Sequence, residues 1–217
     1  MLVNKNVLID APPDIYHEIK KHNVDPTQIT NILITHAHDD HIMGLFDLTH
    51  IYRKEKRIRL VTTHGVFAQI NKKLGISALR FKKTVVKPFE SFHLGKDVFC
   101  WFIPVEHTVE AYGIKIKAPK PVLYAPEFRK IYRSNRKPLG DLDLAIIDGS
   151  SRTRIGQARG HETIEEGIRF GTNIHAKKVL FTNIGHKTAT HDELVRFVKE
   201  EGGNRFDIAF DGKLIRL

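Results

Sequence analysis

A cluster of three histidines and two aspartates, His36-Ala37-His38-Asp39-Asp40-His41, sets the strongest limit on the fold of this chain. Residues 29–35 before it predict a buried strand, so the cluster lies at the strand's C-terminal end, where α/β folds place chemistry. In an extended strand end His36 and His38 point the same way, while Asp40 and His41 lie in the following turn. One short loop can therefore supply ligands to two metal ions. The alternative is a surface turn that is rich in histidine and binds no metal.

Any metal centre here must use histidine and carboxylate ligands, because Cys100 is the single cysteine of the chain. Imidazole and carboxylate together suit Zn, Mn or Fe. Two such cations that share an oxygen can stabilise both the attacking and the leaving atom of a displacement. The sequence thus favours a centre of two divalent ions, with Zn or Mn expected first and Fe also possible.

The composition indicates a globular protein of the cytoplasm. The 217 residues are 41% hydrophobic, which is enough for a substantial core. No apolar stretch reaches the roughly 18 residues of a membrane helix, and Asp10 comes too early for a signal peptide, so we expect no membrane partner. Thirty-five basic and 25 acidic residues leave a net charge of +10, which favours anionic partners without choosing among them.

Apolar segments are spread from end to end without a repeat or linker, which predicts a single domain over residues 1–217. Periodicity and capping signals predict helices over 15–22, 42–51, 66–74, 163–175 and 190–200. Strands are predicted over 7–9, 29–35, 58–62, 84–87, 98–105, 112–117, 122–125, 143–148 and 178–183, with short strands in 206–215. This order favours an α/β fold of two packed sheets covered outside by helices.

The histidine cluster, with Leu33-Ile34-Thr35 before it and Ile42-Met43-Gly44-Leu45 after it, resembles the His-x-His-x-Asp-His signature of the metallo-β-lactamase superfamily. The resemblance extends over nearly the whole chain and implies a four-layer αβ/βα sandwich with two divalent metal ions. Asp10 resembles the family's structural aspartate, which anchors the metal loop; the alternative is an ordinary strand-end aspartate. The family usually has a Gly-rich strand pair before this segment. The chain therefore either lacks an edge hairpin or begins upstream of Met1.

The resemblance also implies ligands beyond the first cluster. His107, in Val105-Glu106-His107-Thr108, resembles the next metal-binding histidine. Glu127 stands where a bridging aspartate is usual, and Asp148 competes with it for that role. The full set of implied metal ligands is His36, His38, Asp40, His41, His107, Glu127 and His186.

The last ligand is the weakest match, because Asn183 stands where the family places a histidine in Leu-Thr-His-x-x-His. An amide oxygen is a poor ligand for Zn. Either His186, three residues later, completes the second metal site, or that site is weak or empty.

His161, before a capped helix, resembles a catalytic histidine of the phosphodiesterase branch, especially the cyclic phosphodiesterase of phosphonate breakdown. Such a histidine can protonate a leaving alkoxide or bind a phosphate. The alternative is a solvated histidine at a helix entry.

Two basic segments accompany the implied site. Residues 128–138 follow Glu127, and Arg152, Arg154 and Arg159 lead into His161. Arginine suits bidentate recognition of phosphate, although each of these side chains could simply be solvated. A third basic run, residues 53–59, is predicted to be a helix end.

We therefore expect a metal-dependent hydrolase that acts on a small phosphodiester. A metal-bound hydroxide, held between His36, His38 and His107 on one side and Asp40 and His41 on the other, attacks phosphorus, and His161 protonates the departing oxygen. Asp40 and His161 are thus the predicted catalytic residues. The alternatives are an RNA- or DNA-processing nuclease and a non-catalytic metal- or nucleic-acid-binding member of the fold. The long arm of transfer-RNA 3′-processing members is absent from the sequence.

Overall fold

The computed structural model describes residues 1–51, 58–75, 80–95, 97–155, 157, 159–186 and 188–217. These residues form two compact units. Unit 1 consists of Met1–Leu94 and Val109–Ala111, and unit 2 of Gly95–Thr108 and Tyr112–Leu217. Within these ranges none of the helices combines the length and apolar character that a bilayer crossing requires.

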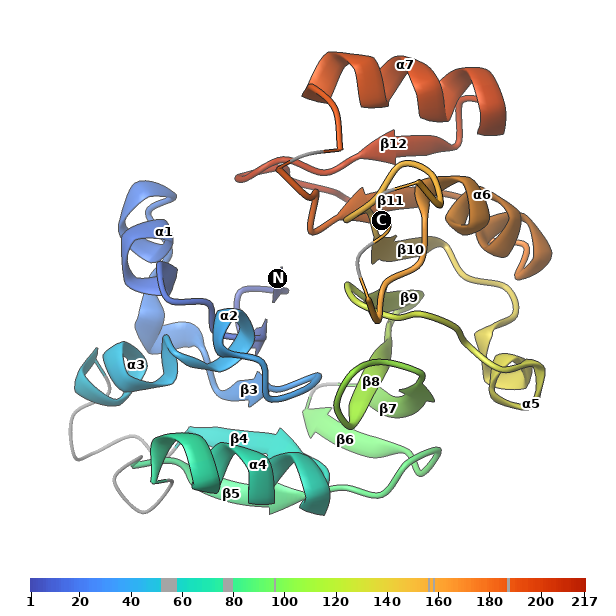
Figure 1. Cartoon of the computed structure of the whole chain (residues 1–217). Coiled ribbons are helices and arrows are strands. Elements are labelled where there is room, and N and C mark those ends of the chain that lie inside the picture. Colours follow the sequence, from blue (N-terminus) through green and yellow to red (C-terminus); the bar gives the residue numbers. More distant parts are fainter. Residues whose placement is uncertain (52–57, 76–79, 96, 156, 158, 187) are drawn as a thin grey trace. The chain divides into compact units, whose positions relative to one another are not determined.

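Unit 1 is built on a sheet of strand order β1-β2-β3-β4-β5 (Figure 1). β1 (Leu2–Val3) runs antiparallel to β2 (Val7–Ile9), so a short edge hairpin is present. The strands β2, β3 (Asn31–Leu33), β4 (Arg59–Thr62) and β5 (Lys82–Val85) are parallel. All residues of β2 and β3 are buried, as is typical of parallel strands covered on both faces. Because Ile9 pairs with Leu33, Asp10 and the histidine cluster emerge at the same edge.

The helices of unit 1 follow the predicted signals with one exception. Thr63 accepts a hydrogen bond from the N–H of Val66 to begin α4, and Gly75, at φ 62°, ends it. The helix predicted over 42–51 is instead two helices, α2 and α3, because Gly44 packs against residues 11–12. The N–H of Gly44 donates to Ala11 O, and a Cβ at Gly44 would collide with the carbonyl oxygen of Pro12. The helices are α1 (Ile15–Lys21), the 3-10 helix η1 (Pro26–Gln28), α2 (Asp39–Ile42), α3 (Leu45–Ile51) and α4 (His64–Leu74).

The second sheet has the order β12-β11-β10-β9-β8-β7-β6. Its strands β9 to β12 are parallel, and β8 is antiparallel to β9. The C-terminal ends of β9, β10 and β11 therefore share one edge, which carries Glu127, Asp148 and Asn183. The strands are β6 (Phe92–Gly95), β7 (Val98–Val105), β8 (Ala111–Ala118), β9 (Lys120–Ala125), β10 (Leu144–Asp148), β11 (Val179–Thr182) and β12 (Phe206–Ile208).

Helices cover the parallel part of this sheet in unit 2. α6 (Ile164–Asn173) packs on β10, α7 (His191–Gly202) packs on β12, and the two helices contact each other (Figure 1). The short helices α5 (Arg133–Arg136) and η3 (Lys137–Leu139) precede β10. A cluster of buried side chains beneath α6 and α7 includes Phe128, Phe181 and Phe206.

Several predicted boundaries are wrong. Residues 206–215 form only β12, because the chain turns at Phe210 and returns Lys213 Nζ to within 2.6 Å of Asp207 Oδ2. The strand predicted over 84–87 lies at Lys82–Val85, and β1 and β6 were not predicted. Of the third basic run, residues 53–57 lie outside the described residues, and Arg59 begins β4 rather than ending a helix.

Candidate metal and catalytic residues

Asp10 organises the loop that carries the histidine motif in unit 1. Its side chain is buried beyond the end of β2, and its backbone takes φ 59°. Its carboxylate accepts hydrogen bonds from Thr35 N at 2.8 Å and from Thr35 Oγ1 at 2.9 Å. His41 Nδ1 lies 2.9 Å from its Oδ2. One carboxylate therefore holds both the start and the end of the loop.

Burial acts to raise the pKa of Asp10, but the facing His41 and His36 and the donated hydrogen bonds bring that pKa below its usual value. Asp10 is thus an ionised partner suited to orienting an imidazole.

The histidines of the motif direct ring nitrogens toward one another. His36 Nδ1 lies 2.9 Å from Thr35 Oγ1, and His36 Nε2 lies 3.0 Å from His38 Nδ1. The ring centroids of His36 and His41 are 4.2 Å apart. His41 Nε2 lies 3.6 Å from Asp40 Oδ2. We call His36, His38, Asp40 and His41 the unit 1 cluster.

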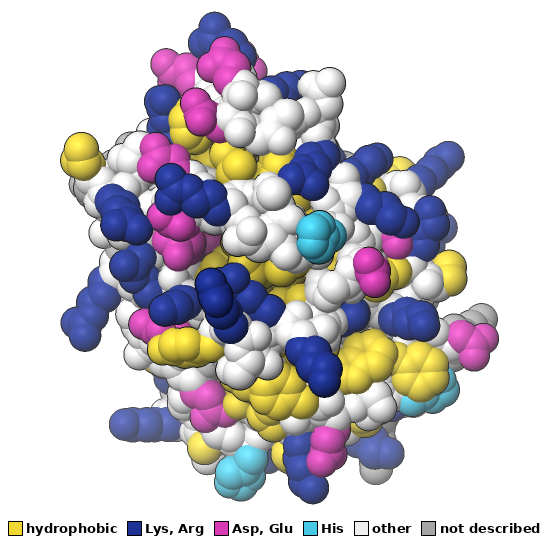
Figure 2. Space-filling model, turned by 90° about the vertical axis from the view of Figure 1, so that its right-hand side faces the viewer, with side chains coloured by type: hydrophobic (Ala, Val, Ile, Leu, Met, Phe, Trp, Pro, Cys, Tyr) yellow, Lys and Arg dark blue, Asp and Glu magenta, His cyan; other side chains and the backbone are white. Residues whose placement is uncertain are grey.

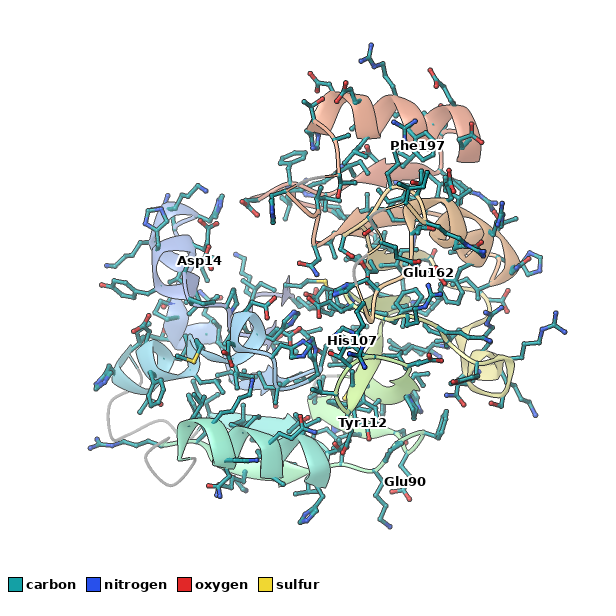
Figure 3. The ribbon with its side chains drawn as sticks, in the orientation of Figure 1. Asp14, Glu90, His107, Tyr112, Glu162 and Phe197 are labelled. Carbon is teal, nitrogen blue, oxygen red and sulfur yellow. The ribbon has the colours of Figure 1, made fainter. Side chains whose placement is uncertain are left out.

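A second group of predicted ligands meets in unit 2, where His107 follows β7 (Figure 3). Its Nε2 lies 3.0 Å from Glu127 Oε2, and its Nδ1 lies 2.7 Å from the carbonyl oxygen of Gly160. Asn183 Nδ2 donates to Glu127 Oε1 at 2.6 Å. Gly160 has φ 86°, and a Cβ there would press on Thr108 and His107. We call His107 and Glu127 the unit 2 cluster.

Asp148 holds His161 rather than His107. Its buried carboxylate accepts hydrogen bonds from Phe128 N at 3.1 Å and from Ser150 Oγ at 2.6 Å. His161 Nδ1 lies 2.9 Å from Asp148 Oδ2, and the rings of His161 and His107 are perpendicular with centroids 5.2 Å apart. Within unit 2 the structure therefore pairs Glu127 with a predicted ligand and Asp148 with the predicted proton donor.

Other predicted residues are not drawn into these groups. His186 is exposed and does not belong to the groups of possible metal ligands found among the described residues. The guanidinium of Arg152 lies 4.2 Å from the ring centroid of Phe197, and Arg154 pairs with Glu166 at 3.1 Å. Arg159 is exposed.

Sequence reasoning missed the supporting partners of the histidines. Gly160 contacts His107 through its carbonyl oxygen, and Thr35 contacts His36 through its hydroxyl. No residue pattern in the sequence indicates such contacts. Asp148 was considered only as a bridging ligand. Its place after the apolar run Leu144-Ala145-Ile146-Ile147 indicated a buried carboxylate that needs a partner.

The donor sets of both clusters fit divalent metal ions. A metal-binding histidine usually engages its second ring nitrogen with a carboxylate, a carbonyl or another polar group, which fixes the tautomer and the ring orientation. The histidines show this pattern. Within hydrogen-bond distance of Nδ1 lie Thr35 Oγ1 for His36, Asp10 Oδ2 for His41 and Gly160 O for His107. In each case Nε2 faces another predicted ligand.

Comparisons with known proteins identify the family and the fold. Residues 5–184 match the family model of the β-lactamase superfamily domain. The chain is 27% identical to ribonuclease Z of Staphylococcus carnosus over 119 residues, 52% of this chain, and spans 39% of the length of that relative. It is 27% identical to ribonuclease BN of Erwinia tasmaniensis in a match that covers 87% of this chain and 82% of that protein.

A solved structure shares the fold. A diphosphatase of the PhnP family superposes with a TM-score of 0.83 at 23% identity, covering 97% of this chain and 79% of that one. The predicted α/β class and metallo-β-lactamase fold are thereby confirmed. With its two sheets, its interleaved helices and a match over residues 5–184, the chain belongs to the metallo-β-lactamase superfamily.

Proposed function

We propose that this protein is a metal-dependent phosphodiesterase whose two clusters bind divalent ions, two per chain, with Zn or Mn expected and Fe possible. The ligands are those predicted from the sequence, with His186 the least supported because it is exposed. When bound, the ions supply Lewis-acid stabilisation of negative charge on the phosphate oxygens.

The observation that carries the phosphodiesterase proposal is the pairing of His161 with Asp148. The buried carboxylate lies 2.9 Å from Nδ1, so it fixes the orientation and tautomer of the ring. His161 can then donate a proton to an oxygen leaving group. To Asp40, whose side chain is 61% exposed, we assign the role of accepting a proton from an attacking water.

The relatives support chemistry at phosphate. Those described above are named a diphosphatase and two ribonucleases. A nuclease is therefore the second candidate, and the net charge of +10 is compatible with either substrate. Lys and Arg side chains are spread over the face of the molecule shown in Figure 2, with acidic side chains between them.

Metal analysis combined with hydrolysis of bis(p-nitrophenyl) phosphate tests the proposal. We expect about two ions per chain and turnover with Mn, Zn or Fe that a chelator removes. His38→Ala should abolish turnover and lower the metal content, because it removes an imidazole ligand. His22→Ala removes an exposed imidazole that pairs with Glu18 on α1 and should change neither. Full metal content with undiminished turnover in His38→Ala would contradict the assignment, and a metal-poor, inactive wild type would favour a non-catalytic member.

A further inference from the structure

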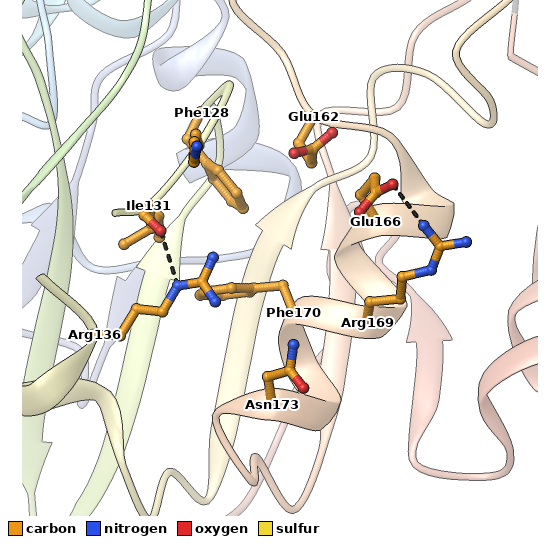
Figure 4. A pocket seen from close by; sticks show the side chains of 9 residues that line it. Phe128, Ile131, Arg136, Glu162, Glu166, Arg169, Phe170 and Asn173 are labelled. Carbon is orange, nitrogen blue, oxygen red and sulfur yellow. Dashed lines mark hydrogen bonds and ion pairs between the residues drawn. The ribbon is translucent and has the colours of Figure 1, made fainter. Parts of the chain in front are cut away.

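A pocket in unit 2 lies between residues 128–136 and α6 (Figure 4). Its cavity volume is about 80 Å³, and it is partly open to solvent. We call it the α6 pocket. It is lined by Phe128, Lys130, Ile131, Arg136, Glu162, Glu166, Arg169, Phe170 and Asn173.

The α6 pocket combines a flat apolar wall with a guanidinium held in place. Phe128, Ile131 and Phe170 are almost fully buried. The guanidinium of Arg136 lies 5.3 Å from the ring centroid of Phe170, and its Nε donates to Ile131 O at 2.8 Å (Figure 4). Its two terminal amino groups donate no hydrogen bond to any described residue. Arg136 therefore presents an oriented pair of donors over an aromatic face.

Acceptors stand opposite these donors. Glu162 Oε1 accepts from Thr163 N at 3.1 Å, whereas Glu162 Oε2 has no hydrogen-bond partner among the described residues. Partial burial raises the pKa of Glu162 above its usual value. Glu166 pairs with Arg154 and Arg169. Two carboxylates in the wall disfavour a simple anion such as phosphate.

A nucleobase matches this combination of groups. A planar ring can stack on an aromatic or guanidinium face, and its edge carries both donors and acceptors. Guanine offers O6 and N7 to an arginine, and its N1–H and exocyclic amino group can donate to a carboxylate. Lys130 and Arg169 also line the pocket, and Arg169 is paired with Glu166 at 2.6 Å.

The α6 pocket adjoins the predicted proton donor through short stretches of chain. Glu162 follows His161 directly, and Phe128 donates its N–H to Asp148. Arg129 Nη1 lies 3.5 Å from Glu162 Oε1 and 3.5 Å from the carbonyl oxygen of His161. A ligand whose base occupies the pocket can thus direct a phosphate toward His161.

We propose that the α6 pocket binds the guanine base of a nucleotide substrate, with Arg136 and Glu162 reading its edge. That the bound nucleotide is hydrolysed rests on the proposed function, whereas its binding in the pocket does not. It narrows the substrate class from phosphodiesters in general to those that carry a guanine nucleotide.

Calorimetric titration of the full chain in excess chelator tests the pocket apart from any metal. We expect GMP to bind, AMP to bind about ten-fold more weakly, and ribose 5-phosphate and inorganic phosphate to bind more weakly still. Equal affinity for GMP and ribose 5-phosphate, or no binding of GMP, would overturn the proposal.

Two variants and a matched control identify the groups that read the base. Arg136→Ala should weaken GMP binding about ten-fold, whereas Arg133→Ala, which removes the same charge from α5 outside the pocket, should change it less than about two-fold. Glu162→Gln should reduce the preference for GMP over IMP, which lacks the exocyclic amino group. Equal losses in Arg136→Ala and Arg133→Ala would indicate only general charge attraction and would also overturn the proposal.

The titration and the hydrolysis assay can fail independently. GMP binding without any metal-dependent hydrolysis would leave the pocket standing and defeat the proposed function. Hydrolysis without GMP binding would overturn the pocket proposal and leave the proposed function standing.

Discussion

Asn183 shows how one side chain can decide what the unit 2 cluster binds. Its Nδ2 donates to Glu127 Oε1 at 2.6 Å, and its backbone takes φ 56° at the end of β11. Where the superfamily pattern has a ligand, this amide instead engages one oxygen of a neighbouring carboxylate. The affinity for a second ion should therefore be limited at this position.

Asn183→His should raise the affinity for the second ion by about ten-fold or more, because it adds an imidazole and releases Glu127 Oε1. Zinc titration against a competing chelator measures the change. Asn183→Ala releases the carboxylate without adding a ligand and separates the two effects. Unchanged stoichiometry and affinity in Asn183→His would mean that His186 or a water already fills the position.

His161→Ala should slow hydrolysis of an alkyl phosphodiester by about 10²–10⁴-fold while largely sparing an activated aryl one, since a good leaving group needs no proton. Parallel assays on methyl and p-nitrophenyl esters measure the ratio. The metal content should remain at the wild-type level, because His161 is not assigned as a ligand. Equal losses on both esters would point to phosphate binding, and metal loss would make His161 a ligand.

At this scale the sequence identified the candidate histidines, because their spacing and their place after strands are local properties. It could not separate Glu127 from Asp148. That distinction depends on which loop faces which carboxylate, and the contacts of Asp148 with Phe128 and His161 join segments 20 and 13 residues away.

Elements with strong local signals were predicted well. Thr63 and Gly75 delimit α4, and the apolar runs of β2, β7 and β10 lie where they were expected. The break between α2 and α3 was missed because it depends on the approach of Gly44 to Pro12, a contact between segments distant in sequence. The edge strand β1 was missed because two residues carry no periodicity.

The N-terminal caps of α6 and α7 also differ. Thr190 and Glu193 exchange both hydrogen bonds at the start of α7. At α6 Thr163 accepts from Glu166 N, but its own N–H donates to Glu162. Glu162, rather than Glu166, therefore accepts the hydrogen bond from the Thr163 N–H.

Thr190→Ala should destabilise the protein by about 1 kcal/mol, because the cap of α7 loses its hydroxyl. For a chain of this size we expect the midpoint temperature of thermal unfolding to fall by about 2–4 °C, measured by calorimetry. Glu193→Gln keeps an acceptor for the Thr190 N–H and should cost less. A Thr190→Ala melting temperature equal to the wild type would show that packing on β12 and α6 holds α7 without the cap.

Across the whole molecule, the net charge of +10 bears on the choice between the two candidate functions. Each nucleic-acid phosphate neutralised by Lys or Arg releases counterions, whereas a small ester releases few. Charge alone attracts both substrates and does not select between them.

We expect the KM for a small phosphodiester to change little between about 50 and 200 mM salt, whereas binding of a single-stranded RNA should weaken steeply. Steady-state kinetics and fluorescence anisotropy at several salt concentrations measure the two slopes. If the RNA is cleaved efficiently at low salt, and if cleavage falls with salt as steeply as RNA binding does, the result would favour the nuclease over the phosphodiesterase.

The hydrogen bonds that Asp10 accepts have a consequence for the proposed binding of metal ions. Thr35 and His41 are tethered to a buried carboxylate by bonds within the protein. These contacts shape the loop independently of a metal, unlike in small zinc domains, which fold only around their ion. Folding and ion binding would then be separate steps, and ligand type and cellular supply would select the ion rather than the folding reaction.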